Sequence, residues 1–400
     1  MFDSLRFSHV KLNIFPTLAF ALIVLVIILA SLYIDASENG KSHHHHHHHR
    51  HHHYNQIQTH HQTTAELKII SEERIVRPRS TLKPQDLDLL VTSPGSATRF
   101  DSRVREFFSS NMCKTRVFMT WISPADLFGE REMFGLESLF QTNPRSCLVI
   151  LSKTMDSDMG RRILDPLVGV GFRAQSVSPD LWALLKNTPA ENWLIDIKNG
   201  KRDPGSIPLG QNLSNLIRLA ALYKYGGVYL DTDFILLRDI SGLRNSIGSQ
   251  SVDVSGNWTR LNNALLIFER EHILVYKFLE EFALSFDGNK WGHNGPYLVS
   301  RVVNSLGRIR GCDFTVLPPT AFYPVDWTRV AGFFVRPNDR SGERWVGAKI
   351  RQLNRSSYGV HLWNRQSRRF KIEEGSVVER LVSVHCVVTC GRTDSSQLTT

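Results

Sequence analysis

The sequence predicts an α/β domain in which helices alternate with buried strands. Two short apolar runs, residues 117–121 and 147–152, have the length and the polar flanks of buried strands. Further along, residues 213–225 carry apolar side chains at helical spacing. In sheets of this kind, ligands bind beyond the carboxyl ends of the strands. The apolar run that ends in Asp231 and Asp233 is therefore the expected position of a functional site.

An uncharged apolar segment, residues 14–34, precedes this domain. As a helix, its 21 residues would span ~31 Å, about the thickness of a hydrocarbon core. Arg6 and Lys11 lie before the segment, and Asp35 follows it directly. The positive-inside rule then predicts a type II transmembrane signal anchor, with residues 1–13 as a cytosolic tail and the rest of the chain in a lumen. A buried helix is the alternative interpretation.

Residues 35–105 are polar and of low complexity, with ten histidines between His43 and His53. Such a composition predicts a disordered stem that holds a globular domain away from the membrane. Metal capture by the histidine tract would lack a fixed geometry. We expect the folded part to start near Arg105 and to cover residues 106–400.

Cysteines and charge limit the compartment and the partners. All five cysteines follow the anchor, and an oxidising lumen would allow two disulfides and one free thiol, in a pairing that the sequence leaves open. N-glycosylation sequons begin at Asn212, Asn257 and Asn354, which agrees with that compartment. The net charge of +10 is not gathered in one block, and we expect no nucleic-acid partner. A membrane surface or an anionic nucleotide substrate fits this charge.

The folded part is expected to alternate short strands with helices. Bounded apolar runs predict strands, and apolar residues three or four apart predict helices. Gly226 and Gly227 predict a helix stop followed by a tight turn. The expected strands are residues 117–121, 147–152, 228–230 and 263–268, and the expected helices are residues 136–141, 181–186, 213–225 and 273–286.

Asp231 and Asp233 are the strongest chemical signal in the chain. Residues two apart on a strand point to the same face, so both carboxylates would lie together at the strand end. Hard oxygen ligands suit Mg²⁺ or Mn²⁺ and, through the ion, a diphosphate. The pair therefore predicts transfer chemistry on a nucleotide-activated substrate. A haloacid-dehalogenase-like phosphatase, with Asp231 as nucleophile, is an alternative, and so is a pair of aspartates that only cap a turn.

The surrounding sequence resembles a known family. Residues 214–218 lead into LAALYKYGGVYLDTDFILL, and FMTWISP begins at Phe118. WGHNGPYLVSRV begins at Trp291, AFYPVDW at Ala321 and YGVHLWN at Tyr358. Over residues 110–390 the chain resembles the DXD-containing glycosyltransferases that include lactosylceramide 4-alpha-galactosyltransferases and alpha-1,4-N-acetylglucosaminyltransferases, with the anchor and stem of plant Golgi-type members. The DXD sugar-binding part would cover about residues 113–240, and the C-terminal alpha-1,4-glycosyltransferase-like part about residues 258–390.

The resemblance implies a GT-A, Rossmann-like domain that binds a UDP-sugar with Mn²⁺ or Mg²⁺. Asp233 would chelate the ion, and Asp231 would contact the ribose or the same ion. On the preceding helix, Ser214 and Arg218 would contact the donor sugar or phosphate. Asn215 stands where the family usually has Asp, which keeps an acceptor oxygen but loses a charge.

Two further clusters and one strand residue complete the predicted site. The first is His293, Asn294 and Gly295, whose imidazole would complete the metal shell or bond a phosphate oxygen. The second is His361, Trp363 and Asn364, with a stacking ring beside polar groups for a sugar or nucleotide. The alternatives are structural: the first cluster would be a turn whose histidine is hydrogen-bonded within the protein, and Trp363 of the second would be packed in the core. The resemblance also places Asn263 in the wall of the site.

The resemblance implies a Golgi type II enzyme that transfers a hexose or N-acetylhexosamine from a UDP-sugar to a glycan or glycolipid acceptor with retention of configuration. We expect a same-side displacement assisted by the leaving diphosphate, because no acidic nucleophile stands out. The alternative is a non-catalytic lumenal sugar-nucleotide-binding protein, suggested by Asn215. The acidic residues considered as nucleophile are Asp253, Glu269, Glu271, Asp287, Asp313 and Asp326.

Overall fold

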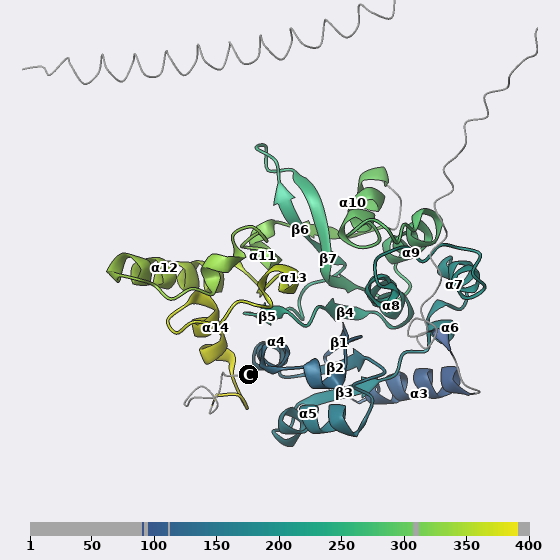
Figure 1. The fold of residues 1–400 in the computed structure, drawn as a ribbon, viewed down its shortest axis with the longest axis horizontal. Coiled ribbons are helices and arrows are strands. Elements are labelled where there is room, and N and C mark those ends of the chain that lie inside the picture. Colours follow the sequence, from purple (N-terminus) through teal and green to yellow (C-terminus); the bar gives the residue numbers. More distant parts are fainter. Residues whose placement is uncertain (1–89, 92–94, 111–112, 307–311, 391–400) are drawn as a thin grey trace, which may run out of the picture. The chain divides into compact units, whose positions relative to one another are not determined.

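The computed structural model describes residues 90–91, 95–110, 113–306 and 312–390 (Figure 1). The predicted tail and anchor, and the stem as far as residue 89, lie outside these described residues. Among the described helices, none has the length and apolar character needed to cross a bilayer.

A seven-stranded mixed sheet forms the centre of the domain, in the order β3-β2-β1-β4-β7-β6-β8. The first four strands in this order are parallel, β7 runs antiparallel to both β4 and β6, and β8 is parallel to β6. The α/β prediction is therefore confirmed, and the sheet is mixed. The strands are β1 (Thr115–Thr120), β2 (Ser146–Leu151), β3 (Arg173–Val177), β4 (Gly227–Leu230), β6 (Ser246–Val252), β7 (Trp258–Phe268) and β8 (Thr315–Leu317).

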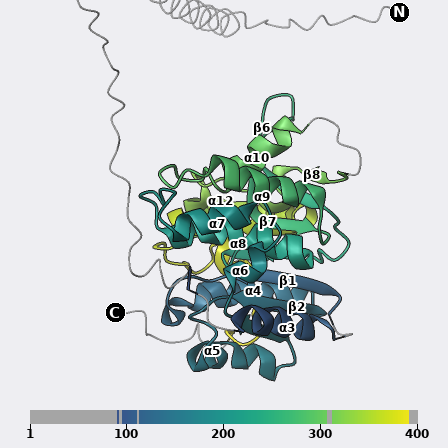
Figure 2. The same cartoon turned by 90° about the vertical axis from the view of Figure 1, so that its right-hand side faces the viewer.

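Helices cover both faces of this sheet, which explains the continuous apolar runs of its strands (Figures 1 and 2). Successive side chains of β1 enter opposite cores: Phe118 joins one, and Val117 and Met119 join the other. The first core is closed by α3 (Ser96–Phe108), α6 (Leu181–Leu185), α7 (Ala190–Lys198), α8 (Leu209–Tyr225), α9 (Ile273–Ser285) and α10 (Pro296–Ser305). The second is closed by α4 (Glu130–Thr142), α5 (Asp158–Gly169), α11 (Pro319–Phe322), α12 (Arg340–Ser356) and α14 (Val377–His385).

The strand and helix positions expected from the sequence are confirmed, with shifted ends. The helix expected from residue 213 already begins at Leu209, and the strand expected from residue 263 is the second half of β7. Gly226 and Gly227 end α8 with φ angles of 65° and 117°. A Cβ on Gly227 would lie 2.5 Å from the Arg116 carbonyl oxygen, so this turn requires glycine.

The folded region begins earlier than expected. Helix α3 lies largely within the segment that the sequence assigned to the stem. Phe100, Val104 and Phe108, each four residues apart, are buried in the first core, and Leu90 is buried there too. Polar residues separate these buried side chains, so the average composition of the segment does not reveal the apolar face of the helix. The predicted boundary near Arg105 is therefore corrected.

A two-stranded ribbon joins distant parts of the chain. Strand β5 (Phe234–Leu236) pairs antiparallel with β9 (Gly359–His361), so that Phe234 lies opposite His361. A Cβ on Gly359 would lie 2.3 Å from the Phe234 ring and 2.8 Å from the Ile235 carbonyl oxygen. Only glycine permits this approach, and the ribbon thereby brings the C-terminal part of the chain to the turn that follows β4.

Two disulfides and one free thiol are present among the described cysteines, as the sequence allowed. Cys113 pairs with Cys147, and Cys386 pairs with Cys390, while Cys312 is free. The first bridge joins the segment before β1 to the neighbouring strand β2. The second closes a short loop after α14.

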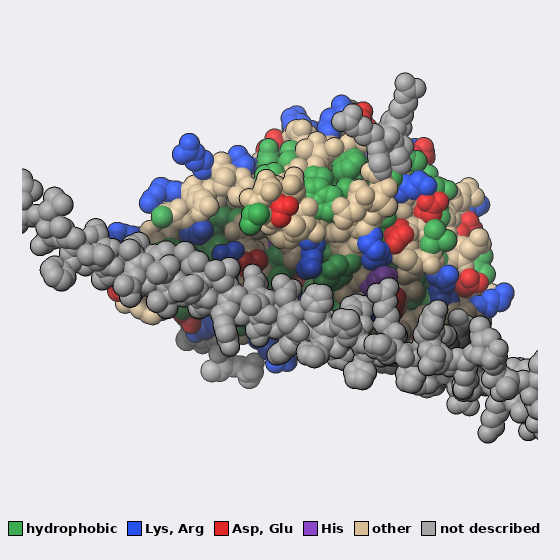
Figure 3. Space-filling view, turned by 90° about the horizontal axis from the view of Figure 1, so that it is seen from above, with side chains coloured by type: hydrophobic (Ala, Val, Ile, Leu, Met, Phe, Trp, Pro, Cys, Tyr) green, Lys and Arg blue, Asp and Glu red, His purple; other side chains and the backbone are tan. Residues whose placement is uncertain are grey.

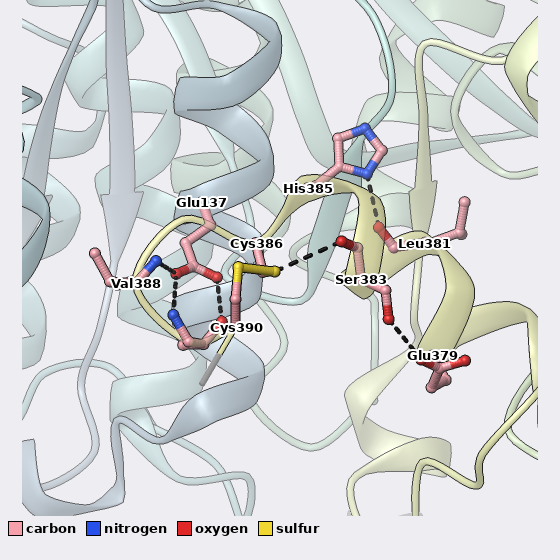
Figure 4. Close-up of a disulfide and its surroundings, with 9 residues drawn as sticks. Glu137, Glu379, Leu381, Ser383, His385, Cys386, Val388 and Cys390 are labelled. Atoms are coloured by element: carbon pink, nitrogen blue, oxygen red, sulfur yellow. Dashed lines mark hydrogen bonds between the residues drawn. A yellow bond between two sulfur atoms is a disulfide. The ribbon is translucent and has the colours of Figure 1, made fainter. Parts of the chain in front are cut away.

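Glu137 of α4 fixes that loop from inside (Figure 4). Its side chain is 0% exposed. Its Oε1 accepts hydrogen bonds from the backbone N–H groups of Val388 at 2.7 Å and Thr389 at 2.8 Å. Its Oε2 accepts a third bond from the Thr389 hydroxyl. The buried carboxylate is thus satisfied by three donors of the disulfide loop and ties α4 to the C-terminal segment.

Replacing Glu137 with Ala should lower the free energy of unfolding by about 3 kcal/mol, because unmade bonds to buried donors cost about 1–3 kcal/mol each. Chemical denaturation of the purified full chain in detergent would measure this. Glu137→Gln keeps an acceptor oxygen and should lose less. Glu106→Ala, at an exposed position of α3, is the control and should change stability by less than about 0.5 kcal/mol. Equal stability of Glu137→Ala and the control would contradict this account.

Candidate functional site

The two aspartates lie in the turn between β4, which ends at Leu230, and β5, which begins at Phe234. One ligand atom from each of Asp231, Asp233 and His361 can be chosen so that all lie within 4.8 Å of one another. Two carboxylates and an imidazole at this separation form the group best suited to hold a metal ion among the described residues.

Asp233 is held by the segment that follows β9. The backbone N–H of Asn364 donates to Oδ2 at 2.7 Å, and His361 Nε2 lies 3.3 Å from Oδ1. The Leu362 N–H also donates to the Asp233 carbonyl oxygen at 2.9 Å. Trp363 between them adopts a left-handed backbone, with φ 55° and ψ 56°. This conformation is costly for a bulky residue, and here it accompanies a segment that bonds Asp233 at three points.

Asp231 is held by Arg218 of α8. The guanidinium Nη2 lies 3.2 Å from Oδ1, and the Tyr229 hydroxyl donates to the same oxygen at 2.9 Å. Arg218 also donates to the Asn263 carbonyl oxygen at 2.7 Å and to the Ser214 hydroxyl at 3.3 Å. Its guanidinium lies 4.5 Å from the centre of the Tyr229 ring. Arg218 borders the cleft, yet its donors are used within the protein, so its observed role is to position Asp231.

Burial and neighbouring charges shift the pKa values of Asp231, Asp233 and His361. Burial raises the pKa of Asp231 above its usual value, against the opposing effect of Arg218. Burial acts the same way on Asp233, but His361 and the Asn364 N–H hold the pKa of that carboxyl below its usual range. Burial acts to lower the pKa of His361, whereas Asp233 raises it above the usual value. Asp233 therefore carries the more firmly established negative charge of the pair.

Asn215 and Asn263 lie together in the wall of the site. Asn263 Nδ2 donates to Asn215 Oδ1 at 2.9 Å, and Asn215 Nδ2 donates to the Gln211 carbonyl oxygen at 3.2 Å. The amide thus has a partner for its oxygen and one for its nitrogen. A carboxylate at this position could accept the bond from Asn263 but could not donate to Gln211. The structure therefore accommodates Asn215 as a fully bonded residue.

The cluster of His293, Asn294 and Gly295 does not contribute side chains to the metal group. His293 Nε2 lies 2.8 Å from the Ser285 carbonyl oxygen. Asn294 Nδ2 donates to Asn212 Oδ1 at 2.9 Å. A Cβ on Gly295 would lie 2.7 Å from Asn215 Oδ1, so this glycine supports Asn215 from behind.

This corrects the expectation that His293 is a metal ligand. The turn that contains it is packed against the end of α9, whereas the β5–β9 pairing carries His361 to Asp233. Because His361 is far from the aspartates in the sequence, its proximity to Asp233 could not be predicted from the sequence alone.

A cleft of about 2430 Å³ opens over the metal group. It exceeds the ~300–1,000 Å³ typical of a site for one small ligand, so it has room for two substrates. Trp363 borders it but is largely buried, with its Nε1 donating to the Val325 carbonyl oxygen at 2.9 Å, which favours the packed interpretation. Lining residues that the sequence analysis did not place in the site include Trp121, Glu132, Gln250, Trp291, Trp327 and Arg336.

A divalent ion fits the donor set of this group. Nine buried side-chain atoms have no hydrogen-bond partner in the described structure, and two of them, His361 Nδ1 and Asn364 Oδ1, lie at the metal group. Unpaired buried polar atoms are uncommon and call for an explanation, and a bound ion or nucleotide is one. Asp231, Asp233 and His361 would hold Mn²⁺ or Mg²⁺, which when bound would act as a Lewis acid toward a diphosphate.

Helix α4 supports the aspartate turn at Gly135. A Cβ there would lie 2.8 Å from the Thr232 carbonyl oxygen and 3.2 Å from that of Phe234. Gly135→Ala should therefore displace the turn and weaken Mn²⁺ binding by about tenfold or more, as loss of an outer support of metal ligands does. Titration of the full chain with Mn²⁺ would measure it. Gly169→Ala, in α5 with no atom within 4 Å of the added methyl, should bind as the parent does. Equal affinities of the two variants would refute the support by α4.

Two family models match the chain. Residues 129–253 match the glycosyltransferase sugar-binding region containing the DXD motif, and residues 267–393 match the alpha 1,4-glycosyltransferase conserved region. Together these matches contain the aspartates and His361.

Curated relatives agree with these models. Human lactosylceramide 4-alpha-galactosyltransferase is 32% identical over 64% of this chain and 71% of that protein. Human alpha-1,4-N-acetylglucosaminyltransferase is 26% identical over 52% of this chain and 58% of that protein. The uncharacterized Arabidopsis thaliana protein At4g19900 is 31% identical over 72% of this chain, but the match spans only 44% of that longer protein. The chain therefore belongs to the DXD-containing alpha-1,4-glycosyltransferase family.

Proposed function

We propose that this glycosyltransferase transfers a hexose or N-acetylhexosamine from a UDP-sugar to a glycan or glycolipid acceptor, with a Mn²⁺ ion and with retention of configuration. The observation that carries the proposal is the group of Asp231, Asp233 and His361 at a cleft with room for two substrates. The phosphatase alternative does not agree with the family. Galactose and N-acetylglucosamine lead as donor sugars, because the named relatives are transferases of these two.

The residues of the site divide the work of donor binding. Asp233 is fixed by the β9 segment, so its carboxylate is held in place before the donor arrives. Arg218 keeps Asp231 aligned beside it. Two atoms beside them have no hydrogen-bond partner within the described protein, Asn364 Oδ1, which is an acceptor, and His361 Nδ1. Preorganised groups of this kind lower the cost of ordering the site during the reaction.

Retention is supported by how the carboxylates that border the cleft are bonded. None of the six carboxylates considered from the sequence borders it. The glutamates that do border it are Glu130, Glu132, Glu373, Glu374 and Glu379. Four of them are bonded within the protein: Glu132 Oε2 accepts the Gly129 N–H at 3.0 Å, Glu373 and Glu374 accept bonds from Arg336, and Glu379 accepts the Gly375 N–H at 3.3 Å. A carboxylate oxygen that already accepts such a bond is a weaker nucleophile. A same-side displacement, in which the departing diphosphate accepts the proton of the attacking hydroxyl, needs no such nucleophile.

We further propose that the enzyme is a type II Golgi membrane protein with its catalytic domain in the lumen. Residues 14–34 would be the anchor. The two disulfides support an oxidising compartment. Of the three sequons, Asn257 and Asn354 are exposed and accessible to a glycan, whereas Asn212 is 3% exposed and bonded to Asn294.

Asp233→Asn should reduce UDP release from every sugar nucleotide by at least about 100-fold, because it removes a charged ligand of the ion and the partner of His361. The full chain in detergent, with Mn²⁺ and a panel of UDP-sugars, provides the assay. Asp165→Asn, an exposed position of α5, removes the same charge outside the cleft and should retain full activity. If the parent chain releases UDP from no donor, the non-catalytic alternative is correct.

The anomeric configuration of the first product formed should match that of the donor sugar. Proton NMR of the product, recorded before any mutarotation, distinguishes the two anomers. An inverted product, or a trapped covalent glycosyl-enzyme, would contradict the same-side displacement.

A further inference from the structure

We propose that one wall of the cleft binds an anionic group of the acceptor, a carboxylate or a phosphate, beside the donor site. The wall is the segment of residues 365–371, which we term the cationic wall. It contains Arg365, Arg368, Arg369 and Lys371 and no acidic residue, and all four basic residues line the cleft. The inference rests on the proposed function and specifies its acceptor.

The cationic wall starts directly beside the metal group. Asn364, whose N–H bonds Asp233, is the residue before it. The wall is held by Arg131, whose guanidinium donates to the carbonyl oxygens of Ser367, at 2.8 Å, and Phe370. The Phe370 ring packs against Phe334 at 5.8 Å between ring centres. The backbone of the wall is thus fixed, and its charged side chains extend from a defined support.

The charges of the wall are not neutralised by the protein. Within the described residues, no carboxylate forms an ion pair with Arg368, Arg369 or Lys371. The glutamates that follow the wall have other partners: Glu373 accepts the Arg336 N–H, Glu374 pairs with the Arg336 guanidinium at 3.0 Å, and Glu379 accepts the Gly375 N–H at 3.3 Å and the Ser383 hydroxyl. Exposed like charges within four residues of one another repel, so an anion in the cleft would be attracted to them.

The acceptor is a better occupant than the donor. The diphosphate of a UDP-sugar is offset by the divalent ion at Asp231 and Asp233, so the wall offers charge in excess of what the donor needs. The same cleft exposes sugar-sized aromatic faces, Trp291 at 49% and Trp327 at 47%. Rings of this kind pack against sugars, and Arg365 lies over the Trp291 ring at 3.6 Å. Aromatic faces beside unpaired cations fit a saccharide that carries a negative group.

The face of the protein seen in Figure 3 is not uniformly basic. On the face visible in Figure 3, basic, acidic and apolar side chains are interspersed. A net charge of +10 alone would therefore not explain a preference for an anionic acceptor at the cleft. This permits a control in which the same charge is removed elsewhere.

The experiment measures binding of three probes to the full chain in neutral detergent, with saturating UDP and Mn²⁺ so that the donor site is filled. The probes are trigalacturonic acid, glycerophosphoinositol and neutral galactotriose. We expect at least one anionic probe to bind more tightly than galactotriose. The triple variant Arg368→Ala, Arg369→Ala, Lys371→Ala should lower the affinity for that probe by about tenfold, because each exposed charge makes a modest contribution to binding. Its affinity for UDP should be unchanged. The preferred probe tells a carboxylate from a phosphate.

The matched control is Arg162→Ala, Lys186→Ala, Lys201→Ala, which removes three exposed positive charges outside the cleft and should leave probe binding unchanged. Equal binding of charged and neutral probes overturns the inference, and so does an equal loss in the control. A triple variant that loses UDP affinity instead assigns the wall to the donor and overturns it too. If UDP with Mn²⁺ does not bind the parent chain, the proposed function itself fails, and that result is separate from the probe comparison.

Discussion

The site depends on the hydrogen bonds that hold Asp233. A carboxylate in a turn has no fixed position of its own, yet here both of its oxygens are bonded by residues about 130 positions further along the chain. The β5–β9 register brings these residues into place, and Gly359 is the residue that lets the two strands approach. The left-handed Trp363 lies between His361 and Asn364, so some backbone strain is retained where the ligand group is assembled.

Helix α4 is the second support of the same turn and connects it to the end of the described chain. Gly135 lies under the Thr232 carbonyl, and the Ser138 hydroxyl accepts the Leu236 N–H at 3.0 Å. On the same helix, Glu137 bonds the loop closed by Cys386 and Cys390. The N-terminal end of α4 also borders the cleft. One helix thus links the aspartate turn, the C-terminal loop and the cleft, which explains why both family regions are needed for one site.

Local sequence signals were sufficient for much of the fold. Buried parallel strands appear in the sequence as continuous apolar runs. The spacing of apolar residues predicted α8, and Gly226 and Gly227 predicted its end. The two aspartates followed directly from the strand that precedes them. Helix α3 was missed because its three buried residues are separated by polar ones in a segment of stem-like composition. For a helix with a narrow apolar face, the spacing of the apolar residues is a better guide than the average composition of the segment.

From the sequence, the third place in the metal group was assigned to His293, because His293 and His361 have the same side chain and both lie far from the aspartates in the sequence. Only the β5–β9 pairing distinguishes them. Asn215 likewise looked like a lost carboxylate, whereas the structure shows both ends of its amide bonded. In the sequence, the basic residues of the cationic wall do not differ from other basic residues. The structure shows that they line the same cleft.

The most direct test of the account is a Mn²⁺ titration of the full chain, followed by electron paramagnetic resonance, in His361→Ala and His293→Ala. The account predicts that His361→Ala weakens Mn²⁺ binding by about tenfold or more, because it removes a ligand and the partner of Asp233, while His293→Ala binds as the parent does. Unchanged binding in His361→Ala, or a comparable loss in His293→Ala, would contradict it.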